Sequence, residues 1–430
     1  MLRNPVSTPQ QAHSCNDRKT IRSLTVPGLG PNVAKIGRLI PAPDISIEPV
    51  LSLGAFMPTA ATRFNSVLDA GPVVKVTAGR YAIAWAIKLL GLQKGDGVLM
   101  PAFHCASMIE PLSVVGAEPV FYRINDDLTI DLDDVRSKLT PSVKAILATH
   151  YFGFPQPLAA LREFCDGAGI ALIEDCAHSF FGNFAGRPVG SYGDFAIASP
   201  RKFFPVPDGG ILVRRSENTS TISLSSADFP SAAKQAFNFL EHSLAYGRLF
   251  AIAPIINLIG YLGRAARGSQ KNVGLDKIEP ILVGGDSGAF GDFDAALMLK
   301  KMSGFSRLTC GAVAKSRMIA HRRKNYIKLL RGLEGLPRCR PLFPELPAEV
   351  VPHMFPLWVD DLDTVFPKLE DLAVPMQRFG QFLWPDTDGT TCPVSSEMSR
   401  HLVQFPCHQE LTERELDTII TRIRSALDAS

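Results

Sequence analysis

The sequence has no marked excess of charge of either sign, no Cys-x-x-Cys pair and no apolar run long enough to span a membrane. Its 45 basic and 42 acidic residues leave a net charge of +3 at pH 7, which argues against a polybasic nucleic-acid binder. The 8 cysteines show no zinc-ligand spacing, so we expect no metal site and interpret them as reduced thiols. Residues 1–24 contain basic side chains but no apolar run, so they do not predict a secretory signal. We therefore expect the protein to be cytoplasmic.

The composition that is present is typical of a globular protein, with 46% hydrophobic and 20% charged residues over 430 positions. This length exceeds one ordinary domain core and predicts two. Residues 1–45 are rich in Pro, Ser, Asn and Gln and predict a loose N-terminal arm. We expect a large α/β domain over residues 46–300 and a smaller C-terminal α+β domain over 301–430.

Short apolar runs alternate with helical stretches from about residue 75. Each run is apolar on both faces and is bounded by turn residues, which is typical of buried parallel strands. Between two of them, Pro157–Cys165 predicts a helix that stops at Gly167. This alternation predicts an α/β domain with helices on both faces of a mainly parallel sheet. The predicted strands are Val98–Met100, Pro119–Tyr122, Ala145–Ala148, Ile170–Ile173, Phe195–Ala198 and Ile211–Val213.

The pattern changes over residues 218–290, where strand signals vanish and a helical insertion is predicted. Within it, Leu249–Gly263 is a nearly continuous apolar run flanked by arginines. A membrane span needs about 20 residues, and Pro254 interrupts this shorter run. We favour a helix pair buried in the core or in a subunit interface over a helix that lies on a membrane surface.

The C-terminal domain has its own signals. A long basic helix is predicted over Ala312–Leu330 and a strand near Pro356–Val359. Thr412 and Glu415 form a capping box, which predicts the start of a closing helix with one apolar stripe.

Three predicted strand ends carry chemically useful residues, and ligands of open α/β sheets bind outside the carboxyl ends of the strands. Asp175 ends one buried run, Lys202 follows another, and the turn at Gly79–Arg80 opens an apolar helix whose N-terminus can hold a phosphate. Pyridoxal phosphate (PLP) requires these three parts: a lysine that bonds to it, a carboxylate at its pyridinium nitrogen and a phosphate cradle. Taken singly each part is weak, because a strand-end Asp is commonly a cap and a lone Lys a solvated charge.

Further segments fall into a fixed order around these residues. Glu174–His178 reads Glu-Asp-Cys-Ala-His, and Gly186–Asp194 follows it. Lys202 falls 202 − 175 = 27 positions after Asp175, and Asp208–Gly210 comes next. This order resembles the DegT-type (DegT/DnrJ/StrS) sugar aminotransferases, which are PLP enzymes of the aspartate-aminotransferase fold. The match is close from about residue 75 to 215 and faint beyond, so the resemblance is to a divergent member.

The resemblance implies a type I PLP-dependent transferase fold for the large domain, with roles for several residues. Lys202 would bond to PLP and shuttle the proton of the amino acid. Asp175 would keep the ring nitrogen protonated, and His178 would lie beside the ring.

The phosphate would be held by Ser199 and by the turn that contains Gly79 and Arg80. In the position where many family members stack an aromatic side chain on the ring, this sequence has Cys105 with His104 beside it, and we assign His104 to cofactor binding. The Asn-x-Arg-Met segment with which a second subunit usually completes the site is absent from 285–300.

The implied function is transamination from an amino acid, glutamate by analogy, to a keto-sugar that is usually nucleotide-linked, in polysaccharide or secondary-metabolite biosynthesis. The resemblance also implies a homodimer. Two alternatives stay open. One is dehydration of a sugar with pyridoxamine phosphate, although relatives that dehydrate typically replace the lysine. The other is a non-catalytic homologue that binds PLP.

Overall fold

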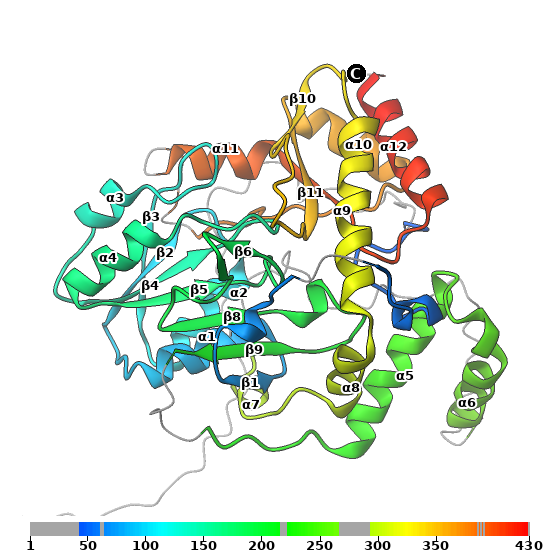
Figure 1. The fold of residues 1–430 in the computed structure, drawn as a ribbon, viewed down its shortest axis with the longest axis horizontal. Helices are drawn as coiled ribbons and strands as arrows, with labels where there is room; N and C mark the ends of the chain where they lie inside the picture. Colours follow the sequence, from blue (N-terminus) through cyan, green and yellow to red (C-terminus); the bar gives the residue numbers. More distant parts are fainter. Residues whose placement is uncertain are drawn as a thin grey trace, which may run out of the picture. The chain divides into compact units, whose positions relative to one another are not determined.

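A seven-stranded sheet forms the centre of the large domain, in the order β1-β9-β8-β5-β4-β2-β3 (Figure 1). The computed structural model describes residues 43–60, 64–215, 222–265, 293–384, 387, 389 and 392–428. All six predicted strands are present close to their expected bounds, and β1 is an additional strand that the sequence did not signal. The strands are β1 Val73–Val76, β2 Gly97–Pro101, β3 Glu118–Tyr122, β4 Val143–Thr149, β5 Ala171–Asp175, β8 Phe195–Ala198 and β9 Gly210–Arg214.

The sheet is mainly parallel, as predicted, and β9 is the exception. It pairs antiparallel with both β8 and β1. The prediction of a parallel strand at Ile211–Val213 was therefore wrong. The physical reason is the connection from β8, which contains only the short turn η5 (Pro200–Lys202) and no crossover helix.

Both faces of the sheet are covered, which explains why its strands are apolar on both sides. In β8, Phe195 and Ile197 pack into one core cluster, whereas Ala196 and Ala198 pack into another. The first cluster includes side chains of α1 (Gly79–Leu89) and α4 (Ala159–Ala168). The second includes side chains of α5 (Phe229–Ala245) and α9 (Lys315–Gly332). Short elements complete this region: α2 Ala106–Ile109, α3 Leu132–Ser137, β6 Asn183–Phe184, β7 Arg187–Pro188, α7 Ala295–Met298 and α8 Gly304–Ala312.

Helix α4 starts two residues after its predicted start at Pro157 and ends three residues after Cys165, so it does not stop at Gly167. It continues to Ala168, and Gly169 caps it with φ of 67°. A left-handed residue after the last turn suits glycine because it has no Cβ to clash with the carbonyl.

A second, three-stranded antiparallel sheet lies in the C-terminal part of the chain, flanked by α9 and α12 (Figure 1). The predicted capping box is confirmed, because the Glu415 amide donates to Thr412 Oγ1 at 3.2 Å and the Thr412 amide donates to the Glu415 carboxylate at 2.7 Å. Residues 41–430 form one compact unit, so the domain boundary at residue 300 stays a prediction. The elements here are β10 Cys339–Pro341, β11 Met354–Val359, α10 Leu362–Asp371, α11 Pro393–His401, β12 Leu402–Pro406 and α12 Glu413–Asp428.

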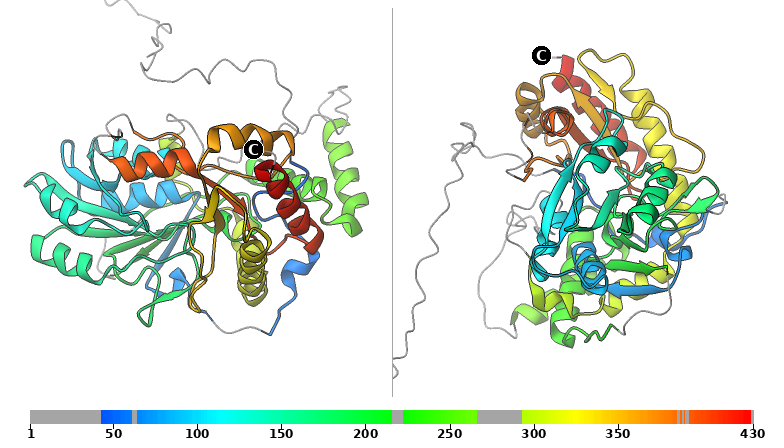
Figure 2. Two further views of the ribbon diagram at one scale, coloured as in Figure 1. Left: turned by 90° about the horizontal axis from the view of Figure 1, so that it is seen from above. Right: turned by 90° about the vertical axis from the view of Figure 1, so that its left-hand side faces the viewer.

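The predicted insertion is mainly helical from Phe229 to Ala265, residues 222–228 are extended or irregular, and residues 216–221 and 266–292 lie outside the described residues. It contains α5 and α6 (Ala253–Ala265), and α6 lies at the periphery in Figure 1 and in the left view of Figure 2. Among the described residues, no single helix is long and apolar enough to cross a membrane. The α5 helix together with Phe250–Leu262 meets the length and composition criteria, but this pair is bent by 119°.

Candidate active site

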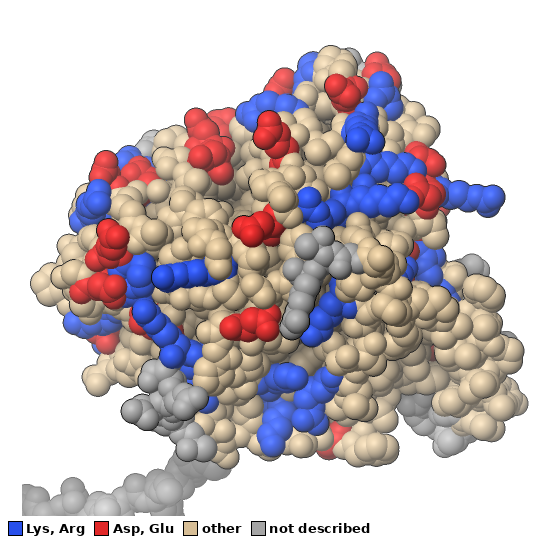
Figure 3. All heavy atoms as spheres, in the orientation of Figure 1, with Lys and Arg blue, Asp and Glu red and all other residues tan. Residues whose placement is uncertain are grey.

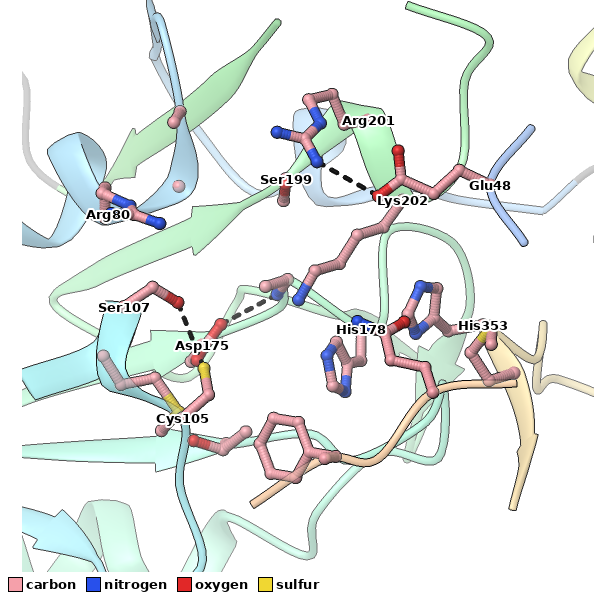
Figure 4. A pocket seen from close by; sticks show the side chains of 18 of the residues that line it. Glu48, Arg80, Cys105, Ser107, Asp175, His178, Ser199, Arg201, Lys202 and His353 are labelled. Carbon is pink, nitrogen blue, oxygen red and sulfur yellow. Dashed lines mark hydrogen bonds and ion pairs between the residues drawn. The ribbon is translucent and has the colours of Figure 1, made fainter. Parts of the chain in front are cut away.

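A pocket opens at the edge of the sheet where the parallel strands end (Figure 4). Residues at or just after the ends of β1, β2, β4, β5 and β8 line it. Its empty volume is about 970 Å³, with the open mouth included. The structure brings most of the predicted site residues together at its wall: Gly79, Arg80, Asp175, His178, Ser199 and Lys202.

Asp175 supplies a buried carboxylate at the floor of this pocket. It is the last residue of β5 and is 2% exposed. Its Oδ1 accepts a hydrogen bond from the Ala177 amide at 2.9 Å. Burial, together with the negative charge of Asp175, raises the pKa of the Tyr122 phenol far above its usual range, so that neighbour stays neutral. A fixed carboxylate in such surroundings can pair with a protonated nitrogen of a ligand.

The preceding residue, Glu174, points to the other face of the sheet and is hydrogen-bonded within the protein. Burial alone would raise the pKa of Glu174, but hydrogen bonds from His150 and from backbone amides hold it below its usual value. His150 Nδ1 accepts from the Gln156 amide at 2.8 Å, so the proton of this imidazole is on Nε2 and is donated to Glu174 at 2.9 Å. The Glu174 carboxylate also accepts backbone N–H bonds at 2.6–3.1 Å from Gly190, Tyr192 and Gly193. The Glu174 carboxylate is therefore occupied by protein donors, and these hydrogen bonds hold the end of β5 against residues 190–193.

Lys202 ends the η5 turn, and its side chain extends into the pocket toward Asp175 (Figure 4). Its backbone is held by Arg322 of α9, whose Nη2 donates to the Lys202 carbonyl at 2.8 Å. Burial lowers the pKa of Arg322 to about 10, so its guanidinium is still charged at pH 7. It lies over the Phe203 ring, 4.5 Å from the centroid.

The guanidinium of Arg322 is also fully committed to the protein. Its five N–H groups have acceptors in the Lys202 and Phe203 carbonyls and, beyond the η5 turn, in the Pro352 carbonyl, the His353 carbonyl and Gln409 Oε1. Arg322 therefore positions the lysine loop and has no N–H left over for an anion in the pocket.

The N-terminus of α1 forms an anion-binding corner opposite. Ala78 at the N-cap makes no side-chain capping bond to the first amides of α1. A Cβ at Gly79 would lie 3.6 Å from the Ser199 Cβ, so the helix start and Ser199 converge. Arg80 Nη1 pairs with Glu110 at 3.2 Å. Helix-start amides, a hydroxyl and a guanidinium are the groups that bind phosphate in proteins.

His178 contributes a fixed imidazole to the wall. Its ring stacks on Phe152 and on His353, with centroids 5.7 and 4.6 Å apart. The Phe152 amide donates to Nδ1 at 3.3 Å, so in the neutral ring the proton is on Nε2.

His104 does not line the pocket, although it was assigned to the cofactor. Its ring is fully buried and stacks on Phe121. Nδ1 lies 3.0 and 3.1 Å from the carbonyl oxygens of Ala102 and Pro101, and Nε2 accepts the Trp384 amide at 3.0 Å. Both nitrogens therefore serve the backbone, and burial lowers the pKa of His104 to about 4. Its neighbour Cys105 lines the pocket instead.

Sequence reasoning missed part of the pocket wall. Residues 45–52, which we call the strap, pass along the pocket and contribute Ile47, Glu48 and Pro49. Glu48 pairs with Arg201, Nη2 to Oε1, at 3.1 Å. No motif marks the strap, which falls at the edge of the predicted arm. Further wall residues come from the C-terminal part of the chain: His353, Met354, Gln377, Phe379 and His408.

These residues fit the chemical requirements of PLP. A lysine, a buried carboxylate and an anion corner line one cavity, and each comes from the carboxyl edge of the same sheet. The His178 ring adds an Nε2–H donor.

Comparison with known proteins supports the same family of enzymes. The model for the DegT/DnrJ/EryC1/StrS aminotransferase family matches residues 49–424. A GDP-perosamine synthase of Vibrio cholerae is 32% identical over 171 residues, which cover 39% of this chain and 47% of that protein. A dTDP-4-dehydro-2,3,6-trideoxy-D-glucose 4-aminotransferase of Saccharopolyspora spinosa is 24% identical over 391 residues, covering 88% of this chain and 91% of that protein. The chain thus spans about half the length of the first relative and most of the second.

Solved structures confirm the fold. A putative sugar aminotransferase of Streptococcus pneumoniae in its PLP form has a TM-score of 0.59 at 17% identity, covering 90% of this chain and 99% of that one. An aminotransferase of Streptoalloteichus hindustanus has a TM-score of 0.56 at 21% identity, covering 87% and 98%. The predicted α/β fold of PLP-dependent transferases is therefore confirmed, and the low identities fit a divergent member.

Proposed function

The chain belongs to the DegT/DnrJ/EryC1/StrS aminotransferase family, and we propose that it is a PLP-dependent sugar aminotransferase. Its amino donor is an amino acid, which we propose to be glutamate, and its acceptor is a nucleotide-linked keto-sugar. The amino acid leaves as a 2-oxo acid, and the keto carbon of the sugar becomes an amine-bearing carbon. The product would serve polysaccharide or secondary-metabolite biosynthesis.

The observation that carries this proposal is the meeting of Lys202, Asp175 and the anion corner in one pocket. When bound, PLP supplies an electron sink that lets the α-proton of the amino acid leave. Lys202 would bond to PLP and would hold and move that proton at Nζ. Asp175 would keep a proton on the ring nitrogen, and His178 Nε2–H would donate to a ring substituent.

The phosphate of PLP would lie in the anion corner, on the α1 amides at Gly79, the Ser199 hydroxyl and the Arg80 guanidinium. Lys202 counts against the dehydratase alternative, in which relatives typically replace it. The named activities of the Vibrio cholerae and Saccharopolyspora spinosa proteins, on GDP- and dTDP-linked sugars, support a nucleotide-linked acceptor.

We further propose a homodimer in which α6 contributes to the interface. Ile256 is buried in the core, but most other large side chains of this helix are exposed apolar residues. The lobe over α6, at the right of Figure 3, is almost free of charged side chains. A helix that is apolar around most of its circumference is normally covered. The exposed residues are Ile255, Leu258, Ile259, Tyr261 and Leu262.

We place the protein in the cytoplasm. The seven cysteines among the described residues are all free thiols, which a reducing compartment favours.

Borohydride reduction of the PLP-loaded protein, followed by peptide mapping, tests the central assignment. We expect the pyridoxyl label on the peptide that contains Lys202, and we expect Lys202→Ala to lose both the label and amino-group transfer. General acid–base transfer alone is worth about 10²–10⁴-fold in rate.

Lys144 provides a matched control, since it lies on β4, is exposed and donates to the Pro141 carbonyl. Lys144→Ala should keep the label and the activity. A label on another lysine would overturn the site, and full transamination by Lys202→Ala would overturn the function.

A further inference from the structure

The three arginines at the pocket wall differ in what their guanidinium groups can still do. Arg322 has all five N–H groups on protein acceptors, so it is not available to a ligand. Arg80 lies at the start of α1 in the anion corner and pairs with Glu110, whose side chain is 8% exposed. Arg201 pairs with Glu48, whose side chain is 36% exposed.

The Arg201–Glu48 pair is the one that a ligand can open at low cost. The Arg201 side chain is 17% exposed, about as much as that of Arg80, so the two pairs differ in their carboxylates: Glu48 is reached by water and Glu110 is not. An ion pair whose carboxylate is in contact with water contributes little net stability. The pair lies at the pocket wall above the Lys202 side chain (Figure 4). Arg201 is the residue directly before Lys202 in η5, so a carboxylate held by Arg201 would bring an amino acid to the lysine.

The strap is held by its backbone and by buried side chains on either side of Glu48. Ile45 and Val50 on either side of Glu48 are 3% and 1% exposed. His408 Nε2 bonds to the Ser46 carbonyl at 3.0 Å, and the Leu51 amide donates to Ser243 Oγ at 3.0 Å. The anchors flank Glu48 and do not include its carboxylate.

We propose that Arg201 is the clamp for a carboxylate of the amino donor and that Glu48 is an internal carboxylate which the donor displaces. This rests on the proposed function, in which one pocket serves two unlike substrates in turn. An amino acid brings a carboxylate and replaces Glu48 on Arg201. A keto-sugar brings none at its reacting end, and Glu48 then returns to neutralise Arg201. The exchange solves the recognition of both substrates without moving the backbone.

Binding of glutarate tests the clamp without turnover, because glutarate has the carboxylates of glutamate but no amine. Calorimetry on the PLP-loaded protein should show that Arg201→Gln weakens glutarate binding by about 10- to 100-fold, the range of a charge-assisted contact. Glu48→Gln should strengthen it by up to about 5-fold, since a competitor is lost. Arg307, exposed on α8 and outside the pocket wall, gives the control Arg307→Gln, which should bind like the unchanged protein.

A nucleotide diphosphate is the other anion that this site could attract, so GDP and dTDP are measured as probes. We expect Arg201→Gln to leave their affinities unchanged. If it weakens these nucleotides and not glutarate, the clamp serves the acceptor and the proposal is wrong.

Kinetics give the second readout. Arg201→Gln should raise KM for glutamate by a similar factor, and Glu48→Gln should make glutamate a stronger inhibitor of the reaction with the acceptor. Unchanged glutarate binding in Arg201→Gln, with normal 2-oxo acid release by the unchanged protein, would refute the role of Arg201 and leave the proposed function standing. Absence of 2-oxo acid release from the unchanged protein would instead sink the proposed function.

Discussion

Replacement of Arg322 by Met should destabilise the protein more than any surface arginine variant. The side chain is buried among the η5 turn, α9 and the C-terminal part of the chain, and Met keeps its volume but none of its donors. Five acceptors lose an Arg322 N–H, among them the Lys202 carbonyl at 2.8 Å, and only the Phe203 carbonyl keeps a nitrogen donor, Gln409 Nε2 at 2.9 Å.

The magnitude follows from two opposing contributions. A buried acceptor left unpaired costs about 1–3 kcal/mol, so the four that lose their N–H donor cost at least about 4 kcal/mol. Burial lowers the pKa of Arg322 from 12.5 to about 10, which means that the charged form carries a desolvation cost of about 3 kcal/mol that Met does not. The net loss in the free energy of unfolding is then about 1–5 kcal/mol, because water that reaches some of the carbonyls replaces part of the lost hydrogen bonding.

Urea denaturation followed by fluorescence measures this loss. Arg322→Lys keeps the charge and three donors, so it should lose about half as much and gives a folded reference if the Met variant does not fold. Arg331→Met, at an exposed position of the same helix, should stay within about 0.5 kcal/mol of the unchanged protein. A loss below about 1 kcal/mol in Arg322→Met would refute the account of Arg322 as the support of the lysine loop.

Three further predictions concern Asp175, His408 and α6. Asp175→Asn should unfold at the same urea concentration, because the amide oxygen can still accept from Ala177, but should lose at least about 100-fold in turnover; near-normal turnover would remove Asp175 from the chemistry. Burial lowers the pKa of His408 from 6.5 to about 3, so between these values the unfolded chain binds more protons and the free energy of unfolding falls as pH drops below about 6.5. His408→Gln should flatten that fall between pH 6.5 and 4, by about 3 kcal/mol, and an unchanged slope would contradict the assignment. Ile259→Glu should convert a dimer to a monomer by light scattering; a monomeric unchanged protein, or one that floats with anionic liposomes, would count against the α6 interface.

The fold could be predicted because its signals are local. Apolar runs of the right length predicted six strands of the sheet, and Thr412 with Glu415 predicted the start of the closing helix. β1 was not predicted because Lys75 interrupts its short apolar run, and an edge strand does not need apolar residues on both faces. The antiparallel direction of β9 was not predicted because it depends on the connection from β8 and not on the strand itself.

In the site, too, the residues that could be predicted are those marked by a local signal. Asp175, Ser199 and Lys202 could be placed together because parallel strands bring their carboxyl ends to one edge. His104 illustrates the limit. Because it is next to Cys105, His104 was expected at the position where a side chain stacks on the cofactor ring. Its Nδ1 instead bonds to backbone carbonyls and its Nε2 accepts a backbone amide, so the imidazole lies in the core.

The remaining wall depends on contacts between residues far apart in the chain, which no local pattern reports. Glu48 and Arg201 are separated by 153 positions, and Arg322 and Lys202 by 120. Both pairs converge on η5, where one arginine holds the backbone of the lysine and the other holds a carboxylate beside it. The difference between them is burial: Arg322 is fully buried with every N–H on a protein acceptor, whereas Arg201 is 17% exposed and its partner Glu48 36% exposed. Two arginines of one pocket therefore divide into a fixed support and an exchangeable anion site, because the N–H groups of Arg322 are all on buried neutral oxygens, whereas Arg201 holds a carboxylate that water reaches.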